Sequence, residues 1–369
     1  MKTLLITGST GFLGGATACN ILKEETSYRL LLLVRGDDAS QALERVRQNL
    51  RKFHISEVVL SGLTEENILL GDLADPDVFL TDARLDNVTH VINCAAVASF
   101  GNNPLIWKVN VEGTLKFVAR MNNVSCLERF IHVGTAMSCA PEKGSIVEEE
   151  FITSQQKDHI VEYTWSKATI ERLIKQYYPS FPLIIARPSI VVGHSQLGCQ
   201  PSSSIYWVFT MALTLGKFIC SLEDKIDIVP VDYCAKALTV LLSHPMAGNE
   251  VYHISAGSEK STSFAQIDKA IAKAQNTAPV AERYRQVNYQ DLVQMRKTFP
   301  AIFGPCNERI MLRALYLYGQ FSRLNVTFDN HNLLQLGLSS PPCFTDYVHN
   351  CVKTTQGKSV PELMEVDFK

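Results

Sequence analysis

Closely spaced cysteine pairs are missing from this chain. It has 10 cysteines, but they stand singly and none forms a C-x-x-C pair. Their absence removes support for zinc ribbons and redox dithiols. Isolated spacing favours reduced thiols in a cytoplasmic protein over a disulfide framework. No group of His, Cys and Asp has the spacing of metal ligands, so we expect no metal site.

A long hydrophobic run is also missing. The longest mostly apolar stretch, Ile205 to Cys220, is interrupted by two threonines, Gly216 and Lys217. About 18–20 consecutive apolar residues are needed to cross a bilayer. Residues 1–6 run directly into a threonine and a glycine, which is too short for the apolar part of a signal peptide. We therefore expect a cytoplasmic protein without an integral membrane segment.

Neither sign of charge is in large excess. Lys and Arg total 35 and Asp and Glu total 37, so the formal net charge is −2. This balance argues against a protein that binds nucleic acid or an acidic membrane through bulk charge. Apolar residues make up 46% and charged residues 20% of the chain, a composition that supports a large core and excludes a disordered chain.

Short apolar runs alternate with helical patterns through the first half of the chain. This alternation predicts an α/β fold of the Rossmann type, a doubly wound parallel sheet with helices on both faces. The expected strands are residues 3–7, 30–34, 67–70, 90–94, 129–133 and 183–186, and the expected helices are 15–23, 40–52, 111–121 and 164–177.

The alternation loosens after Pro188. Beyond it we expect a loop over residues 198–204, a helix over 205–217, a strand over 226–231 that returns to the sheet, and a helix over 234–242. The predicted domains are a Rossmann domain over residues 1–260 and a small, mainly helical C-terminal lobe over 261–369, to which part of 194–225 contributes.

A glycine-rich turn follows the first expected strand and opens the first expected helix. Gly8, Gly11 and Gly14 have the spacing of a dinucleotide-binding turn. There the backbone approaches a pyrophosphate and the helix N-terminus offers free N–H groups. A turn without a ligand is the alternative, but the strand–turn–helix context favours a dinucleotide. The expected contacts are Gly8, Ser9, Thr10, Gly11, Phe12 and Leu13.

The second expected strand is followed by Arg35, where NAD enzymes usually carry an acidic residue. A guanidinium suits the 2′-phosphate of NADPH, and Arg45 or Arg47 could add a second contact. An exposed arginine at a strand end is the alternative. Asp72 follows the third strand and is the candidate for the adenine amino group, with a turn aspartate as the alternative.

Tyr163 and Lys167 lie four residues apart on an expected helix and therefore share one face. An ammonium beside a phenol favours the phenolate, so this pattern predicts a lowered pKa for Tyr163. Such a tyrosine exchanges a proton with a carbonyl oxygen beside the nicotinamide. Thr135, after the strand 129–133, could hydrogen-bond that oxygen. Ser138 is the second choice, and a hydroxyl satisfied within a turn is the alternative for both.

Together these residues resemble the extended short-chain dehydrogenase/reductase superfamily, and within it the thioester reductase branch. That branch contains fatty acyl-CoA reductases and the reductive release domains of carboxylic acid reductases and of peptide or polyketide synthetases. One departure is Gly134, where the family usually has serine before the threonine. The resemblance rests on Thr7–Gly14, Leu33–Arg35, Gly71–Leu73, Asn93–Ala96, Val109–Thr114, Tyr163–Lys167, Ala186–Gly193 and Val229–Tyr233, and it covers residues 1–260.

The resemblance implies that Thr135, Tyr163 and Lys167 are catalytic. Thr135 and Tyr163 hold the substrate oxygen, while Lys167 binds the nicotinamide ribose. The implied activity is hydride transfer from NADPH to an acyl thioester of CoA, or of a carrier protein acting in trans, to give an aldehyde or an alcohol. Further cofactor contacts implied by the resemblance are Leu73, Ala95, Ala96, Asn110, Pro188, Ser189 and Ile190.

Two alternative functions stay open. One is another extended reductase or epimerase acting on a sugar nucleotide, an alcohol or a ketone, although Arg35 weighs against the epimerases, which mostly use NAD. The other is a non-catalytic NADP-binding sensor, which would not need a proton donor such as Tyr163. We prefer a monomer and expect no nucleic acid partner.

Overall fold

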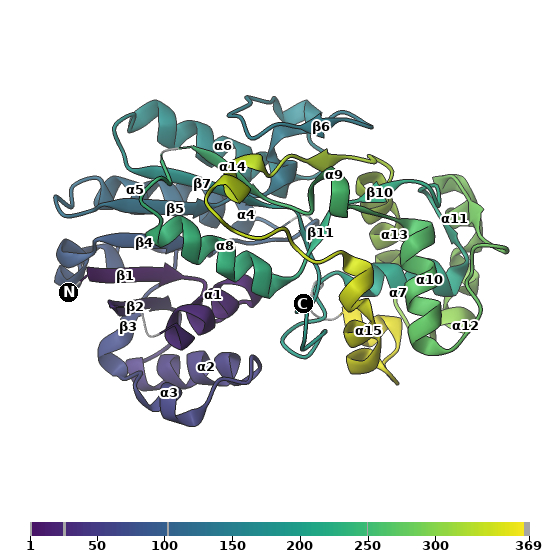
Figure 1. Cartoon of the computed structure of the whole chain (residues 1–369), viewed down its shortest axis with the longest axis horizontal. Helices are drawn as coiled ribbons and strands as arrows, with labels where there is room; N and C mark the ends of the chain where they lie inside the picture. Colours follow the sequence, from purple (N-terminus) through teal and green to yellow (C-terminus); the bar gives the residue numbers. More distant parts are fainter. Residues whose placement is uncertain (1, 25–26, 102, 249, 365–369) are drawn as a thin grey trace.

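A central parallel sheet organises the computed structural model, which describes residues 2–24, 27–101, 103–248 and 250–364 (Figure 1). The strands are β1 (Lys2–Thr7), β2 (Tyr28–Val34), β3 (Ile68–Leu70), β4 (His90–Asn93), β5 (Arg129–Val133), β7 (Leu183–Pro188) and β12 (Val251–Ile254). They pair in the order β12-β7-β5-β4-β1-β2-β3, and every pairing is parallel. The chain order reverses between β1 and β4, and open α/β sheets bind ligands beyond the carboxyl ends of the strands at such a reversal.

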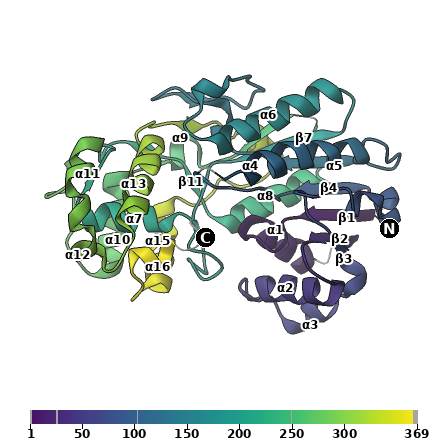
Figure 2. The same ribbon diagram turned by 180° about the vertical axis from the view of Figure 1, so that it is seen from behind.

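Alternate residues of the strands face two different cores. Leu4 and Ile6 of β1 belong to one apolar cluster and Leu5 to another, so both faces of the sheet are buried, as its nearly continuous apolar strands require. The helices on the first face are α1 (Phe12–Lys23), α2 (Ala39–Arg51), α3 (Glu57–Ser61) and α8 (Val231–Ser243). On the opposite face, seen in Figure 2, lie α4 (Leu105–Trp107), α5 (Thr114–Met121) and α6 (Glu162–Tyr177). The predicted doubly wound fold is confirmed.

One expected strand is wrong. Residues 226–231 do not return to the sheet, because the run is divided between β10 (Lys225–Ile226), β11 (Ile228–Val229) and the start of α8, which Pro230 precedes. β11 pairs with β8 (Ile190–Val191) in a separate ribbon. Asp227 lies between β10 and β11, and its carboxylate accepts hydrogen bonds from Ala256 N at 2.7 Å and Phe328 N at 3.1 Å. The seventh strand of the sheet is β12 instead, which we did not anticipate.

A second, mainly helical part lies at the end of the molecule farthest from β1 (Figure 1). Its apolar core draws on residues 192–228 and 264–364 and includes the fully buried Trp207. The domain boundary at residue 260 stays a prediction. The helices of this part are α7 (Tyr206–Leu215), α10 (Phe264–Gln275), α11 (Tyr289–Met295), α12 (Phe299–Phe303), α13 (Glu308–Ser322), α15 (Phe344–Thr355) and α16 (Val360–Met364).

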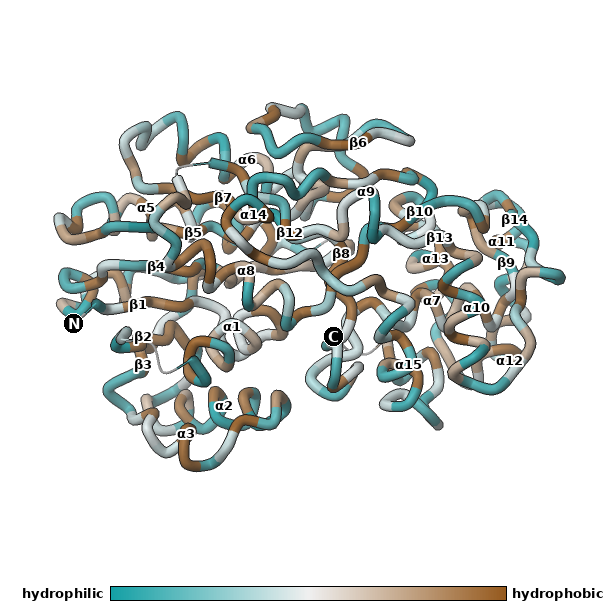
Figure 3. The backbone as a smooth tube through the Cα atoms, in the orientation of Figure 1, coloured by the Kyte–Doolittle hydropathy of each residue, from teal (hydrophilic) through white to brown (hydrophobic). Residues whose placement is uncertain are grey.

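Short elements connect the two parts. α14 (His331–Gln335) contacts β12, and its Leu333 belongs to the core of the sheet. Figure 3 shows hydrophobic segments in central strands such as β4 and β7 and hydrophilic segments toward the outside. No helix within the described ranges is long and apolar enough to cross a membrane. Further short strands and one short α-helix are β6 (Ile146–Val147), β9 (Lys217–Phe218), β13 (Thr262–Ser263), β14 (Arg285–Gln286), β15 (Thr327–Phe328) and α9 (Gly257–Lys260).

Candidate active site

The glycine turn between β1 and α1 has the geometry that a pyrophosphate requires. Gly8 has φ +74°, and a Cβ there would lie 2.9 Å from Ala95 N. A Cβ at Gly14 would lie 2.3 Å from Gly8 O, so α1 packs directly on the turn. α1 begins after Gly11 without a side-chain cap, which leaves the N–H groups of its first turn available to an anion. The turn therefore fits a dinucleotide.

Asn49, on α2, hydrogen-bonds the backbone of this turn. Its Nδ2 donates to Ser9 O and to Gly11 O, both at 3.0 Å. Asn49 lies on α2 and is buried, and sequence reasoning missed it. The only available signal was a polar residue on the apolar face of an amphipathic helix. Deleting this amide would leave Ser9 O without its donor, whereas Gly11 O would still accept from Gly15 N at 3.0 Å.

A cavity of about 350 Å³ lies beyond the turn, at the carboxyl ends of β1, β2, β3 and β4. Three of the predicted contacts of the turn have their side chains elsewhere. Ser9 is fully buried, the Phe12 ring packs 6.4 Å from the Phe53 ring, and Leu13 does not line the cavity. The predicted cofactor contacts that do line it are Gly8, Thr10, Gly11, Arg35, Arg45, Asp72, Leu73, Ala95 and Ala96.

Arg35, Arg45 and Asp72 gather at the β2 end of this cavity. Arg35 Nη1 lies 3.8 Å from Asp72 Oδ2, and Arg45 donates to the Arg35 carbonyl. Of the two arginines considered for a second contact, Arg45 lines the cavity, whereas Arg47 donates to Leu63 O at 2.8 Å. The Arg35 side chain is 67% exposed, so its charge is available to a ligand.

Asn110 lies behind the cavity rather than in its lining. It sits in η4 (Lys108–Gly113), a π-helical turn of the kind often found at functional sites. Its Oδ1 accepts from Val97 N at 2.8 Å, and its Nδ2 donates to Ser166 Oγ at 3.0 Å. Ser166 Oγ in turn donates to Tyr163 O at 2.7 Å. Asn110 therefore ties α6 to the segment after β4, and a direct cofactor contact for it stays a prediction.

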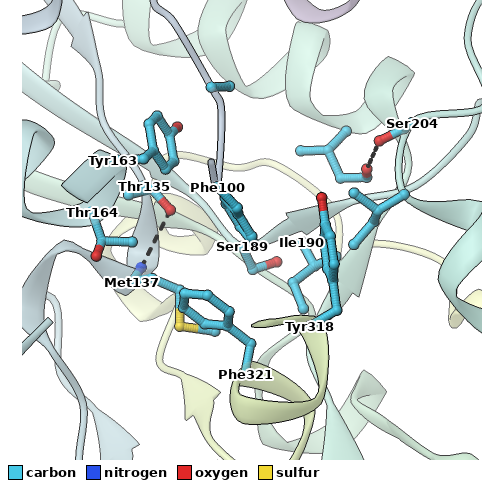
Figure 4. Close-up of a pocket in the computed structure, with 13 residues that line it drawn as sticks. Phe100, Thr135, Met137, Tyr163, Thr164, Ser189, Ile190, Ser204, Tyr318 and Phe321 are labelled. Atoms are coloured by element: carbon cyan, nitrogen blue, oxygen red, sulfur yellow. Dashed lines mark hydrogen bonds between the residues drawn. The ribbon is translucent and has the colours of Figure 1, made fainter. Parts of the chain in front are cut away.

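A second cavity, of about 250 Å³, is lined by two of the three predicted catalytic residues (Figure 4). Thr135 and Tyr163 line it together with Ser189 and Ile190. Thr135 Oγ1 accepts a long hydrogen bond from Met137 N at 3.4 Å. Ser138 is fully buried and does not line this cavity. Of the two candidate hydroxyls, Thr135 is therefore the one that lies with Tyr163.

The expected lowering of the Tyr163 pKa is wrong. Burial, reinforced by the negative charge of Glu171, raises the pKa of Tyr163 to about 12. Lys167 does not counter this, because its Nζ donates to Val133 O at 2.6 Å. Lys167 is 2% exposed, and burial lowers its pKa to about 8. Tyr163 is therefore a neutral phenol at physiological pH, the state that can donate a proton.

A buried ion pair supports this site from beneath. Arg187 of β7 and Glu171 of α6 are each 1% exposed, with 2.6 Å between Nη2 and Oε2. Arg187 Nη1 also donates to Glu150 O at 3.1 Å. A Cβ at Gly134 would lie 2.3 Å from Glu171 Oε1. The Glu171 carboxylate thus fills the space that a side chain at position 134 would need, which accounts for glycine before Thr135.

Similarity to known proteins agrees with this geometry. The model of the male sterility protein family, a family of NAD-binding domains, matches residues 6–238. The probable fatty acyl-CoA reductase 5 of Arabidopsis thaliana is 23% identical over 440 aligned positions, which cover 91% of this chain and 89% of the relative. The non-canonical nonribosomal peptide synthetase hkm10 of Aspergillus hancockii is 24% identical over 272 positions, which cover 68% of this chain. This chain spans 26% of the length of hkm10.

Solved structures share the fold. The terminal R domain from the myxalamid PKS-NRPS pathway has a TM-score of 0.77 at 19% identity, covering 96% of this chain and 90% of that one. A thiolation-reductase di-domain from an archaeal non-ribosomal peptide synthetase has a TM-score of 0.72 at 17% identity, with coverages of 96% and 75%. The chain belongs to the male sterility protein family of NAD(P)-dependent oxidoreductases, and the family predicted from the sequence is confirmed.

Proposed function

We propose that this chain reduces acyl thioesters with NADPH and releases an aldehyde or an alcohol together with a free thiol. One observation carries the proposal: the Thr135 and Tyr163 hydroxyls share a mostly apolar cavity, and Tyr163 is held neutral. Membership of a family that includes a probable fatty acyl-CoA reductase supports it. A redox sensor would have no use for a proton donor at this place.

The two hydroxyls supply the polar part of the chemistry. NADPH supplies the hydride when bound. Thr135 and Tyr163 hydrogen-bond the thioester carbonyl oxygen, on which negative charge develops. Tyr163, with its pKa near 12, gives this oxygen a proton. The C–S bond of the resulting hemithioacetal then breaks, so that thioester, NADPH and a proton give aldehyde, thiol and NADP⁺.

The choice of NADPH rests on the arginines beside the first cavity. Arg35 and Arg45 line it, and Arg35 is largely exposed. A guanidinium recognises a phosphate with two parallel hydrogen bonds. Asp72, 3.8 Å from Arg35, is the proposed partner of the adenine amino group. We propose that CoA or a separate carrier protein brings the acyl group, in line with the fold shared with the thiolation-reductase di-domain.

The test is NADPH oxidation by the purified chain with a panel of acyl-CoA and acyl-pantetheine thioesters, while released thiol is measured with a thiol reagent. NADH serves as the cofactor control. Tyr163→Phe is expected to lower kcat/KM about 10²–10⁴-fold and to retain NADPH binding. Tyr177→Phe, on the same helix and 57% exposed, is the matched control and keeps full activity.

Each result has a distinct meaning. Thioester-dependent NADPH oxidation with equal thiol release supports the proposal. NADPH binding without turnover of any thioester refutes it, and turnover of nucleotide sugars, alcohols or ketones by the same protein would establish another extended reductase. A cellular phenotype that is unchanged by Tyr163→Phe would establish a sensor.

A further inference from the structure

The second cavity, named here the acyl pocket, has no charged lining. Its 13 lining residues include no Asp, Glu, Lys, Arg or His. Two of its hydroxyls are already engaged, because Thr164 Oγ1 donates to Val161 O at 3.0 Å and Ser204 Oγ donates to Val191 O at 2.7 Å. A charged acyl group would lose its hydration there without gaining a charged partner, which is costly.

Aromatic rings form one side of the acyl pocket. The ring centroid of Phe100 lies 4.9 Å from that of Tyr318, 5.0 Å from that of Phe321 and 6.2 Å from that of Tyr163. The angles between these ring planes are only 26°, 36° and 31°. Figure 4 shows Phe100 between Tyr163 and Tyr318. Because Phe100 and Tyr318 already stack on each other, a planar ligand would lie against the outside of this ring cluster, with an offset.

The acyl pocket is partly open to solvent, so its size limits how much of an acyl group can be buried in it. An apolar cavity of about 150 Å³ holds one benzene molecule, or about 25 Å³ per carbon. The 250 Å³ of the acyl pocket therefore holds about ten carbons, whereas a sixteen-carbon chain needs about 400 Å³. Ser189 and Ile190, proposed contacts of the cofactor, line the same space, so the room for the acyl group is smaller still.

Phe321 and Met137 separate the acyl pocket from neighbouring empty space. Both also line two smaller spaces beyond the acyl pocket, of about 10 and 60 Å³. The Tyr318 side chain is held in place by packing, because its ring lies 4.8 Å from that of the fully buried Trp207 at an angle of 81°. Removing the Phe321 ring would join the acyl pocket to the space of about 60 Å³.

We propose that the chain selects a compact, uncharged acyl group with a planar part, such as one aromatic ring on a short linker, and that Phe321 sets the length limit. This inference rests on the proposed function. The ring cluster of Phe100, Tyr318 and Phe321 provides the aromatic wall for the planar part. Thr135 and Tyr163 receive the carbonyl oxygen. Phe321 and Phe100 are specificity-determining residues in this account.

The test compares benzoyl-CoA, hexanoyl-CoA and palmitoyl-CoA. For the wild-type chain we expect kcat/KM to fall in that order, with benzoyl-CoA at least about tenfold above palmitoyl-CoA. Phe321→Ala is expected to raise the palmitoyl-to-benzoyl ratio about tenfold or more. Tyr316→Ala removes an aromatic ring from the same helix at a position outside the pocket, where it packs on Tyr289, and leaves the ratio unchanged.

A binding measurement separates this inference from the proposed function. Calorimetry with Tyr163→Phe protein and NADP⁺ gives the Kd of each acyl-CoA without turnover. Tighter binding of benzoyl-CoA than of palmitoyl-CoA supports the inference, even if the wild-type chain reduces no thioester. The absence of thioester reduction would refute the proposed function but not this inference. Preferred binding or turnover of palmitoyl-CoA, or an unchanged ratio in a Phe321→Ala protein that still binds NADPH, overturns the inference and leaves the reductase in place.

Discussion

Gly134→Ala is expected to destabilise the chain although it adds a single methyl group. The new Cβ would lie 2.3 Å from Glu171 Oε1, well inside van der Waals contact. Glu171 cannot move aside without lengthening its 2.6 Å contact with Arg187. Both side chains are 1% exposed, so water cannot replace either partner. Breaking such a pair costs about 3–5 kcal/mol, because it leaves a buried charge uncompensated.

The assay is thermal unfolding, followed by circular dichroism. A loss of that size lowers Tm by about 4–6 °C in a chain of 369 residues. Gly248→Ala is the matched control, since a Cβ there meets nothing within 4 Å, and it is expected to leave Tm within about 2 °C.

A second variant tests the cause. Glu171→Asp shortens the side chain by one methylene and draws the carboxylate away from position 134. The pair Gly134→Ala with Glu171→Asp should therefore lose less stability than the sum of the two single changes, with a coupling of about 1 kcal/mol or more. A Gly134→Ala protein with unchanged Tm, or strictly additive losses, would show that the carboxylate does not occupy this space.

Three further predictions concern ionisable groups. Arg35→Ala is expected to raise KM for NADPH about 10–100-fold and to leave KM for NADH nearly unchanged; equal effects on both cofactors would refute a 2′-phosphate contact. Lys167, whose pKa burial lowers to about 8, is expected to cause an alkaline fall of kcat/KM near that pH, and Lys167→Arg should move the fall upward. Burial raises the pKa of the Glu149 carboxyl from 4.5 to about 7 in the folded chain, so folding favours the protonated form. The stability from that proton is complete below about pH 4.5 and is lost as the pH rises to about 7. Between about pH 5 and about pH 8, Tm should therefore fall less steeply with rising pH in Glu149→Gln than in the wild-type chain. Equal slopes of Tm against pH in the two proteins would contradict this assignment.

Six of the seven strands of the sheet were predictable from sequence, because they are apolar runs buried on both faces of the sheet. β5 (Arg129–Val133) was predicted with its observed bounds, and the second strand, expected at residues 30–34, extends to Tyr28–Val34. The failure at residues 226–231 has a specific cause. The run is apolar enough for a strand, but the buried Asp227 within it bonds two distant N–H groups. A local pattern contains no information about such partners.

The candidate site also has features that the sequence predicts and features that it does not. That Thr135 and Tyr163 lie in one cavity was predictable, because their spacing and their place after strands are local features. The catalytic roles of Thr135, Tyr163 and Lys167 stay predictions. Asn49 was not predictable, because it acts on a turn that lies 38–40 residues away in sequence. The Tyr163 pKa was predicted in the wrong direction because the Val133 carbonyl engages Lys167, a partner that helical spacing does not reveal.

The composition of the second core constrains how this protein can diversify. That core draws on residues 192–228 and again on 264–364, while the intervening α8 and β12 belong to the sheet. The chain thus crosses between the two cores more than once, and no single cut frees the helical part with its core intact. Exchange of residues 264–364 alone by recombination would remove Tyr318, on which the buried Trp207 ring packs at 4.8 Å. If the proposed function holds, we therefore expect new substrate preferences to arise through individual substitutions in the lining of the acyl pocket, not through exchange of the whole helical part.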